Sequence, residues 1–195
     1  SGNSLVLCAR RVEKLELLKK ELEATGCKVL VSECDVTRIG DLEKSVSLGL
    51  KTFGKIDTVI ANAGFGVDGM FEDLQAEDYR RQFETNIYGV INTVKATHNA
   101  LKASRGRLGL LGSVLSYVPC AGLSAYNMSK TAVKALSESL YLEFKPQGIA
   151  VTLICPGFIT SELRGVDRHG RFHEGFKDPI PGWLAMPAES AATVI

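Results

Sequence analysis

The sequence lacks an excess of charge of either sign. Its 195 residues include 23 Lys+Arg and 22 Asp+Glu, which gives a formal net charge of +1 at pH 7. A protein that binds nucleic acid through charge needs surplus cations to displace counterions from phosphate, so this balance argues against a nucleic-acid partner. With 45% hydrophobic residues the chain can bury one substantial core, and we expect a single domain over residues 1–195.

Long apolar runs are also missing. No stretch approaches the roughly 20 uninterrupted apolar residues that a membrane-spanning helix needs, so no transmembrane segment is predicted. The first residues, from Ser1 to Ser4, contain neither a basic nor an apolar segment, and no signal peptide is visible.

The cysteines do not predict a disulfide framework. They are five, an odd number, and form no C-x-x-C pair: Cys8, Cys27, Cys34, Cys120 and Cys155. Cys8 and Cys155 lie inside apolar runs, which predicts buried thiols in a reducing compartment. We therefore expect a cytoplasmic protein.

Short apolar runs of strand length alternate with longer segments of helical period. The runs are rich in Val, Ile and Leu and cover residues 4–9, 28–31, 57–61, 107–111 and 149–155. Most are apolar throughout, which is typical of strands buried on both faces of a parallel sheet. This alternation predicts an α/β fold with a doubly wound, mostly parallel, Rossmann-like sheet in three αβα layers.

The segments between the runs have the spacing of amphipathic helices. One begins near Arg11 with a stripe that includes Leu15 and Leu18, and the next begins at Asp41, which can cap it. The two longest patterns cover residues 76–104 and 124–145. In the first of these, the apolar residues expected to face the core include Tyr79, Phe83 and Ile87.

Residues 156–187 have no clear period and hold four of the six prolines. A long irregular segment beyond the end of a strand is typical of a lid or binding loop. Its aromatic side chains are costly to leave in water, which favours a lid over a plain surface loop. They are Phe158, Phe172, Phe176 and Trp183.

The residues that indicate chemistry follow the fourth apolar run. Tyr126 and Lys130 stand four positions apart at the start of a helix, so both project from one face. Ser113 lies where the preceding strand ends, and the three groups can converge at the carboxyl edge of a parallel sheet. A neighbouring ammonium favours the phenolate and brings the tyrosine pKa from about 10 toward the range of acid–base catalysis. The Y-x-x-x-K spacing alone is a weak signal, because an exposed tyrosine packed on a lysine stem is a common helix pattern.

Further motifs surround these residues in a fixed order. They are Asp35-Val36 after the second strand, the turn Asn62-Ala63-Gly64, the N-x-x-G of Asn86 to Gly89, Ser113, Y-x-x-x-K, and Pro156-Gly157 with Thr160. This combination resembles the short-chain dehydrogenase/reductase family, from Ser4 to the end of the chain. The resemblance implies an NAD(P)-dependent enzyme that interconverts an alcohol and a ketone or aldehyde of a small-molecule substrate.

The resemblance assigns roles to four catalytic candidates. Tyr126 is the implied general acid/base that exchanges a proton with the substrate oxygen, and Ser113 hydrogen-bonds that oxygen. Lys130 lowers the tyrosine pKa and holds the nicotinamide ribose. Asn86 interrupts the local helical bonding and seats a water that links Lys130 to solvent. The cofactor carries the hydride, so the protein orients the reacting groups.

Cofactor choice depends on the end of the first strand, where an acidic side chain would select NAD. This chain has Arg10 and Arg11 there, and guanidinium groups accept the extra phosphate of NADP, so NADP (NADPH) is expected to be preferred. The competing interpretation, a solvent-facing helix start, is less natural because a cation is unfavourable at a helix N-terminus. The resemblance implies further cofactor contacts at the strand ends: Asp35, Val36, Asn62, Ala63, Gly64, Tyr126, Lys130, Pro156, Gly157, Ile159 and Thr160.

No metal site is expected. His169 and His173 are four positions apart beside Glu174, but the segment lacks helical support. Cys120 lies near the catalytic candidates without a histidine close in sequence, so a small apolar filler is favoured over a nucleophile.

The chain departs from the family at both ends. The family begins with a strand, a glycine-rich turn (T-G-x-x-x-G-x-G) and a helix that receives the pyrophosphate, and these are not in the sequence. In the strand order 3-2-1-4-5-6, the missing strand belongs between residues 4–9 and 57–61, which leaves two open edges. The chain also stops in an apolar run, so we expect a domain incomplete at both ends.

Two alternatives to a dehydrogenase stay open. The same scaffold can act as an epimerase or dehydratase, and a regulatory protein on this fold can bind NADP without catalysis. The intact catalytic set argues against the regulatory protein, and the missing glycine-rich turn argues for it if the chain is complete. The resemblance also implies a homodimer or homotetramer, because in related proteins the helices over residues 76–104 and 124–145 pack against their symmetry mates.

Overall fold

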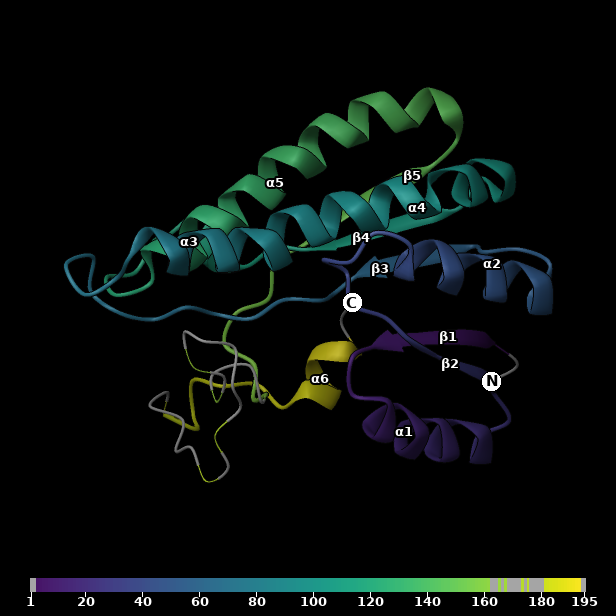
Figure 1. Ribbon diagram of the computed structural model, residues 1–195, viewed down its shortest axis with the longest axis horizontal. Helices are drawn as coiled ribbons and strands as arrows, with labels where there is room; N and C mark the ends of the chain where they lie inside the picture. The colour runs from purple at the N-terminus through teal and green to yellow at the C-terminus, as the bar shows by residue number, and fades with distance from the viewer. Residues whose placement is uncertain are drawn as a thin grey trace.

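The structure, a computed structural model, describes residues 3–161, 165, 167, 173, 175 and 181–193. Strands and helices alternate along the chain (Figure 1). The first half contains β1 (Ser4–Ala9), α1 (Val12–Ala24), β2 (Lys28–Glu33), α2 (Asp41–Phe53), β3 (Thr58–Ala61), α3 (Ala76–Phe83) and the π-helical turn η1 (Glu84–Tyr88). The second half contains α4 (Gly89–Ser104), β4 (Arg107–Leu111), η2 (Val114–Ser116), α5 (Ser124–Phe144), η3 (Lys145–Gln147), β5 (Ala150–Ile154) and α6 (Ala188–Ala192).

All the strand pairs are parallel, as the continuous apolar runs predicted. β1 pairs with β2, with Ser4 opposite Lys28. β4 lies between β3 and β5, and Arg107 is opposite both Thr58 and Ala150. Within the described ranges, the β1–β2 pair and the β3–β4–β5 sheet are not hydrogen-bonded to each other. In each sheet the carboxyl ends of the strands meet at one edge, where the predicted site residues follow them.

Helices cover the strands on two sides, which gives the α/β layers. Figure 1 shows α4 and α5 along the β3–β4–β5 sheet, and α1 and α2 on opposite sides of β1 and β2. The main core joins α4, α5 and the three-stranded sheet: Ala61, Val90, Val94, Leu101, Leu108, Leu110, Val133, Leu140, Phe144 and Ile149. Among the helices of the described residues, none combines the length and apolar character needed to cross a membrane.

Two expectations for the first helices are wrong. In α1 only Leu15 is buried, and Leu18 is 41% exposed, so the apolar stripe is narrower than the spacing predicted. The N-cap of α2 is Gly40 rather than Asp41. Gly40 has a φ of 97°, which a residue without a Cβ adopts easily, and the Asp41 carboxylate instead accepts the backbone N–H of Asp35 at 3.1 Å.

The long helical pattern of residues 76–104 is confirmed, with two differences. The π-helical turn η1 interrupts it between α3 and α4. In α3 and η1 the fully buried side chains are the polar Asp78, Gln82 and Asn86, not the apolar set predicted from the spacing. That predicted set, Tyr79, Phe83 and Ile87, is half-buried. Burial of polar groups is possible here because backbone partners satisfy their hydrogen bonds.

The predicted burial of Cys8 and Cys155 is not found. Cys8 is exposed and Cys155 is half-buried, because β1 has a hydrogen-bonded neighbour on one side only and Cys155 follows the end of β5. The buried thiol is Cys34, and burial raises its pKa to about 11. Trp183 is 84% exposed, against the expectation that the aromatic side chains of residues 156–187 avoid water. Phe172 and Phe176 lie outside the described residues.

Gly89, the last residue of the N-x-x-G motif, gives Val36 room to pack. A Cβ at position 89 would lie 2.5 Å from Cγ2 of Val36. Asn92, about one helical turn later, donates from Nδ2 to the Val36 carbonyl at 3.0 Å. The loop after β2 is therefore fixed to the first turn of α4.

Candidate active site

Lys130 is held by burial and by a contact with the end of β4. Its side chain is 7% exposed, and Nζ donates to the carbonyl of Leu111 at 2.8 Å. Burial lowers the pKa of the Lys130 ammonium to about 8, because desolvation disfavours the charged form. Near neutral pH the side chain is therefore a cation that can readily lose its proton.

Tyr126 lies in the first turn of α5, next to this ammonium. Nζ of Lys130 is 5.7 Å from the centroid of the Tyr126 ring. The chain contains a second pair with the same spacing, Tyr141 and Lys145, whose Nζ-to-centroid distance is 5.6 Å. Tyr141 is 48% exposed at the far end of α5. The two pairs have the same spacing and nearly the same contact distance. They differ because Lys130 is buried and its pair lies at the carboxyl edge of the sheet.

Ser113 follows β4 and caps η2. The serine is 7% exposed, and its Oγ accepts the backbone N–H of Leu115 at 3.1 Å. With this lone pair occupied, the hydroxyl proton is left to donate to another acceptor. Ser116, at the end of η2, donates from Oγ to the carbonyl of Lys130 at 3.0 Å, which ties this turn to α5.

Asn86 lies in η1 and is 1% exposed. Its Oδ1 accepts the N–H of Phe65 at 3.1 Å, and its Nδ2 donates to the carbonyl of Phe65 at 3.0 Å and to Ser129 Oγ at 3.1 Å. A Cβ at Gly64 would lie 3.1 Å from Oδ1 of Asn86 and 3.8 Å from Nζ of Lys130. The glycine of the N-A-G turn therefore allows the turn, Asn86 and Lys130 to meet.

Sequence reasoning missed Gln82, which is fully buried one turn before Asn86. Its amide makes two hydrogen bonds to the loop after β3. The sequence did contain a signal, because Gln82 is a second amide side chain four positions before Asn86 on the same predicted helix. It was not selected because the apolar spacing predicted that the neighbouring face of this helix is buried.

Arg10 and Asp35 lie close to each other at the ends of β1 and β2. Oδ1 of Asp35 accepts the N–H of Thr37 at 3.0 Å and its hydroxyl at 2.8 Å. Burial alone would raise the pKa of Asp35, but these hydrogen bonds and the charges of Arg10 and Arg38 lower it. The structure therefore brings the Arg10 charge to the strand edge. Arg11 is the exposed N-cap of α1.

The remaining cofactor candidates border the same edge. Asn62 and Ala63 are exposed after β3. After β5, the Pro156 carbonyl accepts the N–H of Val114 at 3.0 Å, and a Cβ at Gly157 would meet nothing within 4 Å. Ile159 pairs with Met186 in an isolated parallel bridge, and Thr160 donates its N–H to the Met186 carbonyl at 3.0 Å.

These side chains fit a nicotinamide dinucleotide in chemistry and in access. Guanidinium groups suit phosphate, and carboxylate and amide groups suit adenine and ribose. Ala63, Gly64 and Gly157 carry little or no side chain where a backbone must approach a ligand closely. The open space at Gly157 is consistent with such an approach.

Two further candidates were considered in the sequence: the histidine segment as a metal site and Cys120 as a nucleophile. His169 and Glu174 lie outside the described residues, and Nε2 of His173 is 2.7 Å from Oδ2 of Asp167. Cys120 is exposed, so its interpretation as an apolar filler is wrong. Its carbonyl accepts Nδ2 of Asn127 at 2.9 Å, which holds the loop before α5.

Comparison with known proteins identifies the family. The family of short chain dehydrogenases matches residues 1–171. The chain is 35% identical over 164 residues to 11-beta-hydroxysteroid dehydrogenase A of Sesamum indicum, which covers 83% of the chain. It is 32% identical over 165 residues to the uncharacterized oxidoreductase Lin0452 of Listeria innocua, again over 83% of the chain. The chain belongs to the short-chain dehydrogenase family.

Solved structures agree with this assignment. The alcohol dehydrogenase of the archaeon Thermococcus sibiricus, complexed with 5-hydroxy-NADP, superposes with a TM-score of 0.85 at 26% identity, over 99% of this chain and 78% of that one. NAD⁺-bound xylitol dehydrogenase gives 0.78 at 27% identity, over 83% and 66%. The fold is therefore the Rossmann-like α/β fold. The chain spans 47% of the length of the sesame protein and 66% of the Listeria protein.

The lowered pKa of Lys130 predicts how stability depends on pH. Below about pH 8 the group is protonated in both the folded and the unfolded chain, so the cost of burying the charge is fully present. Between about 8 and 10.5 the folded protein releases the proton first, and the cost disappears as the pH rises. The free energy of unfolding of the wild type should rise by roughly 3 kcal/mol relative to Lys130→Met across this range.

Urea denaturation of both proteins at a series of pH values measures this difference. Lys145→Met, in the exposed pair on the same helix, is the matched control. A wild-type-to-variant difference that does not change between pH 7 and 10.5 would contradict the lowered pKa.

Proposed function

We propose that the protein is an NADP-dependent oxidoreductase that interconverts an alcohol and a ketone or aldehyde, with Tyr126 as the general acid/base. The observation that carries the proposal is the arrangement of Tyr126 beside the buried Lys130, with Asn86 and Gly64 adjoining the same ammonium. The exposed pair on α5 has the same spacing without these neighbours.

The cofactor supplies the hydride acceptor or donor when it is bound. Arg10 and Arg11 would hold the 2′-phosphate, Asp35 and Val36 the adenine, and Asn62 to Gly64 the neighbouring ribose. Pro156, Gly157, Ile159 and Thr160 would border the nicotinamide end. The Thermococcus enzyme is complexed with an NADP derivative, which supports this cofactor class but not the preference.

The proton steps are assigned to this chain's own residues. Tyr126 exchanges the proton with the substrate oxygen, and the hydroxyl of Ser113 donates a hydrogen bond to that oxygen as charge develops on it. The Lys130 ammonium favours the phenolate of Tyr126 through its charge and would also hold the ribose. Both polar ends of the Asn86 side chain are engaged with Phe65 and Ser129, so a water in the relay would bind a backbone group freed by η1.

We also propose a homodimer or homotetramer with an isologous interface over α4 and α5. Large apolar side chains on α5 and on η1, which adjoins α4, are exposed in the single chain: Tyr88, Met128, Tyr141 and Leu142. A symmetric interface over them would remove this area from water. A cytoplasmic location stays a prediction.

Light scattering of the full-length protein at micromolar concentration measures the assembly. We expect a dimeric or tetrameric mass, and Leu142→Asp should lower it because the leucine is 70% exposed on α5. A monomeric wild type would exclude the proposed interface.

The cofactor preference is tested by fluorescence titration with NADPH and NADH. NADPH should bind at least about tenfold more tightly, because a guanidinium pairs with the additional phosphate. Arg10→Ala should remove most of this preference while leaving NADH affinity nearly unchanged. Arg107→Ala, at the amino end of β4, is the matched control. Equal affinities in the wild type, or a preference that survives in Arg10→Ala, would count against the charge argument.

The acid/base assignment is tested by replacing Tyr126 with Phe, which keeps the ring and removes the titrating group. Turnover on a panel of carbonyl substrates should fall by about 10²–10⁴, while cofactor affinity is retained. Ser113→Ala should lower mainly turnover, and Lys130→Met should lower both turnover and cofactor affinity. Tyr141→Phe, in the exposed Y-x-x-x-K pair, is the matched control and should keep wild-type turnover. Near-normal turnover of Tyr126→Phe would sink the assignment.

A further inference from the structure

Part of the loop that follows β3 is buried although it belongs to no strand or helix. Phe65 is 9% exposed and Val67 is 0% exposed. A buried backbone without a neighbouring strand must find other partners for its N–H and C=O groups. Here the partners are side chains of α3 and η1, which pack beside this loop.

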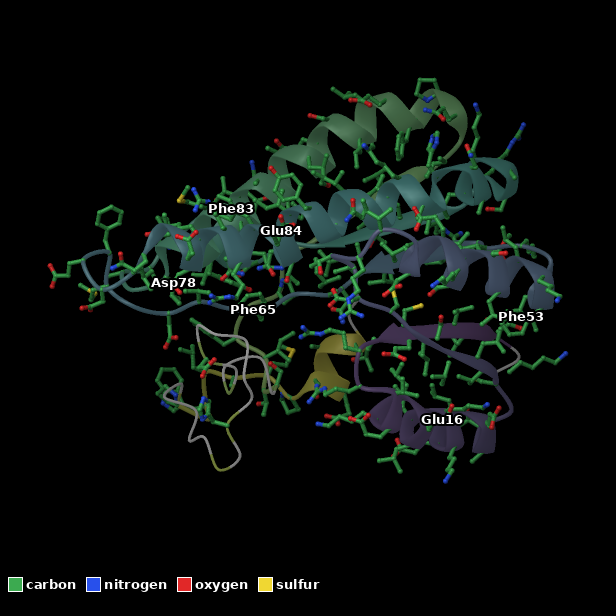
Figure 2. All side chains as sticks on the ribbon, viewed as in Figure 1. Glu16, Phe53, Phe65, Asp78, Phe83 and Glu84 are labelled. Carbon is green, nitrogen blue, oxygen red and sulfur yellow. The ribbon has the colours of Figure 1, made fainter. Side chains whose placement is uncertain are left out.

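Gln82 supplies two of these partners. Its Oε1 accepts the N–H of Val67 at 2.7 Å, and its Nε2 donates to the carbonyl of Phe65 at 2.7 Å. Asn86 binds the N–H and the carbonyl of the same Phe65. Figure 2 shows Phe65 below the turn that carries Phe83 and Glu84. These two residues lie between Gln82 and Asn86 in the sequence. We call Gln82 and Asn86 together the amide clamp.

Position 82 requires an amide side chain. The clamp must accept one hydrogen and donate another at full burial, and Gln82 is 0% exposed. An ionised carboxylate accepts but cannot donate, an ammonium donates but cannot accept, and an apolar side chain does neither. Without Gln82 the buried N–H of Val67 would lose its partner, which would cost more than the bond itself contributes, and the carbonyl of Phe65 would keep only the bond from Asn86.

The clamped loop lies directly against the catalytic candidates. A Cβ at Gly66, between the two clamped residues, would lie 3.7 Å from Cδ2 of Tyr126, so the backbone faces the tyrosine ring across the space of one methyl group. On the other side of Phe65, Gly64 adjoins Asn86 and Lys130. The loop therefore forms a wall for the ring of Tyr126 and for the ammonium beside it.

We propose that Gln82 is a positioning residue: through the loop of residues 65–67 it fixes the ring of Tyr126 relative to Lys130. This inference rests on the proposed acid/base function of Tyr126. Gln82 acts through the backbone of Phe65 and Val67, to which its amide is hydrogen-bonded. When the clamp is released, the loop and the ring gain freedom, and the ammonium favours the phenolate less.

The test compares Gln82→Met with Thr97→Val in the full-length protein. Methionine has a similar length to glutamine but makes neither hydrogen bond. Thr97 is also buried, at 5% exposed, and its Oγ1 donates to the carbonyl of Thr93 within α4 at 2.7 Å, away from the loop. Its replacement therefore controls for loss of a buried hydrogen bond. Both variants should lose thermal stability.

Only Gln82→Met should change catalysis. Its kcat should fall by about ten- to a hundredfold with a smaller change in KM, because misplacing a catalytic group by about 1 Å has effects of this size. In the direction of alcohol oxidation, the pH at which kcat is half-maximal should move upward toward the ordinary tyrosine value of about 10. Thr97→Val should keep the wild-type pH profile. An unchanged profile in Gln82→Met would show that Gln82 serves stability alone and would overturn the proposal.

Two further variants keep the test decisive. Gln82→Glu retains the acceptor for Val67 and regains the donor for Phe65 only when protonated, so its activity relative to wild type should rise as the pH falls. In a Tyr126→Phe background, Gln82→Met should lower the residual turnover little further, because its effect passes through the phenol. An equal fall in turnover in the wild-type and Tyr126→Phe backgrounds would overturn the positioning role of Gln82 but not the proposed function of Tyr126. Full activity of Tyr126→Phe would overturn the proposed function and, with it, this inference.

Discussion

The candidate site depends on how the backbone after β3 satisfies its hydrogen bonds. Phe65 and Val67 are buried, and their polar groups cannot pair with a strand because β3 ends at Ala61. Two amide side chains on one helical run replace the missing strand. That requirement brings polar residues to the buried face of α3 and η1, and it sets where the loop, Asn86 and Lys130 meet.

Sequence reasoning about the fold succeeded for two strands and failed for two helices, each for a physical reason. β1 and β4 were predicted to the residue, because strands covered on both sides are continuously apolar and end at polar residues or glycine. The buried face of α3 was predicted wrongly, because apolar spacing cannot show that a polar side chain has backbone partners. The cap of α2 was missed because a positive φ at Gly40 outweighed the capping ability of Asp41.

The candidate reactive residues could be selected from the sequence more readily than the residues that hold them in place. Tyr126, Lys130, Ser113 and Asn86 were all selected as catalytic candidates from the sequence, since each follows a strand end or lies within an ordered motif, and their catalytic roles stay predictions. Spacing by itself would have selected Tyr141 and Lys145 equally well, and the difference is burial, which sequence does not give directly. Gln82 carries no reactive group, so a search for reactive chemistry had no reason to select it.

The packing of Val36 on Gly89 has a consequence for how the two ends of the site are spaced. Asn86 binds the loop of residues 65–67, whereas Gly89 and Asn92 hold the loop after β2, and all three belong to one helical run. A helical run has a regular rise and turn per residue, about 1.5 Å and 100° in its α-helical part, so the number of residues between Asn86 and Gly89 sets how the two loops lie relative to each other. Inserting one residue between Asn86 and Gly89, or deleting one, would keep these two residues and Asn92 but rotate the anchor of one loop away from the anchor of the other. The separation between the loop after β2 and the loop after β3 is therefore set by the register of this helical run and not by the sequence of either loop.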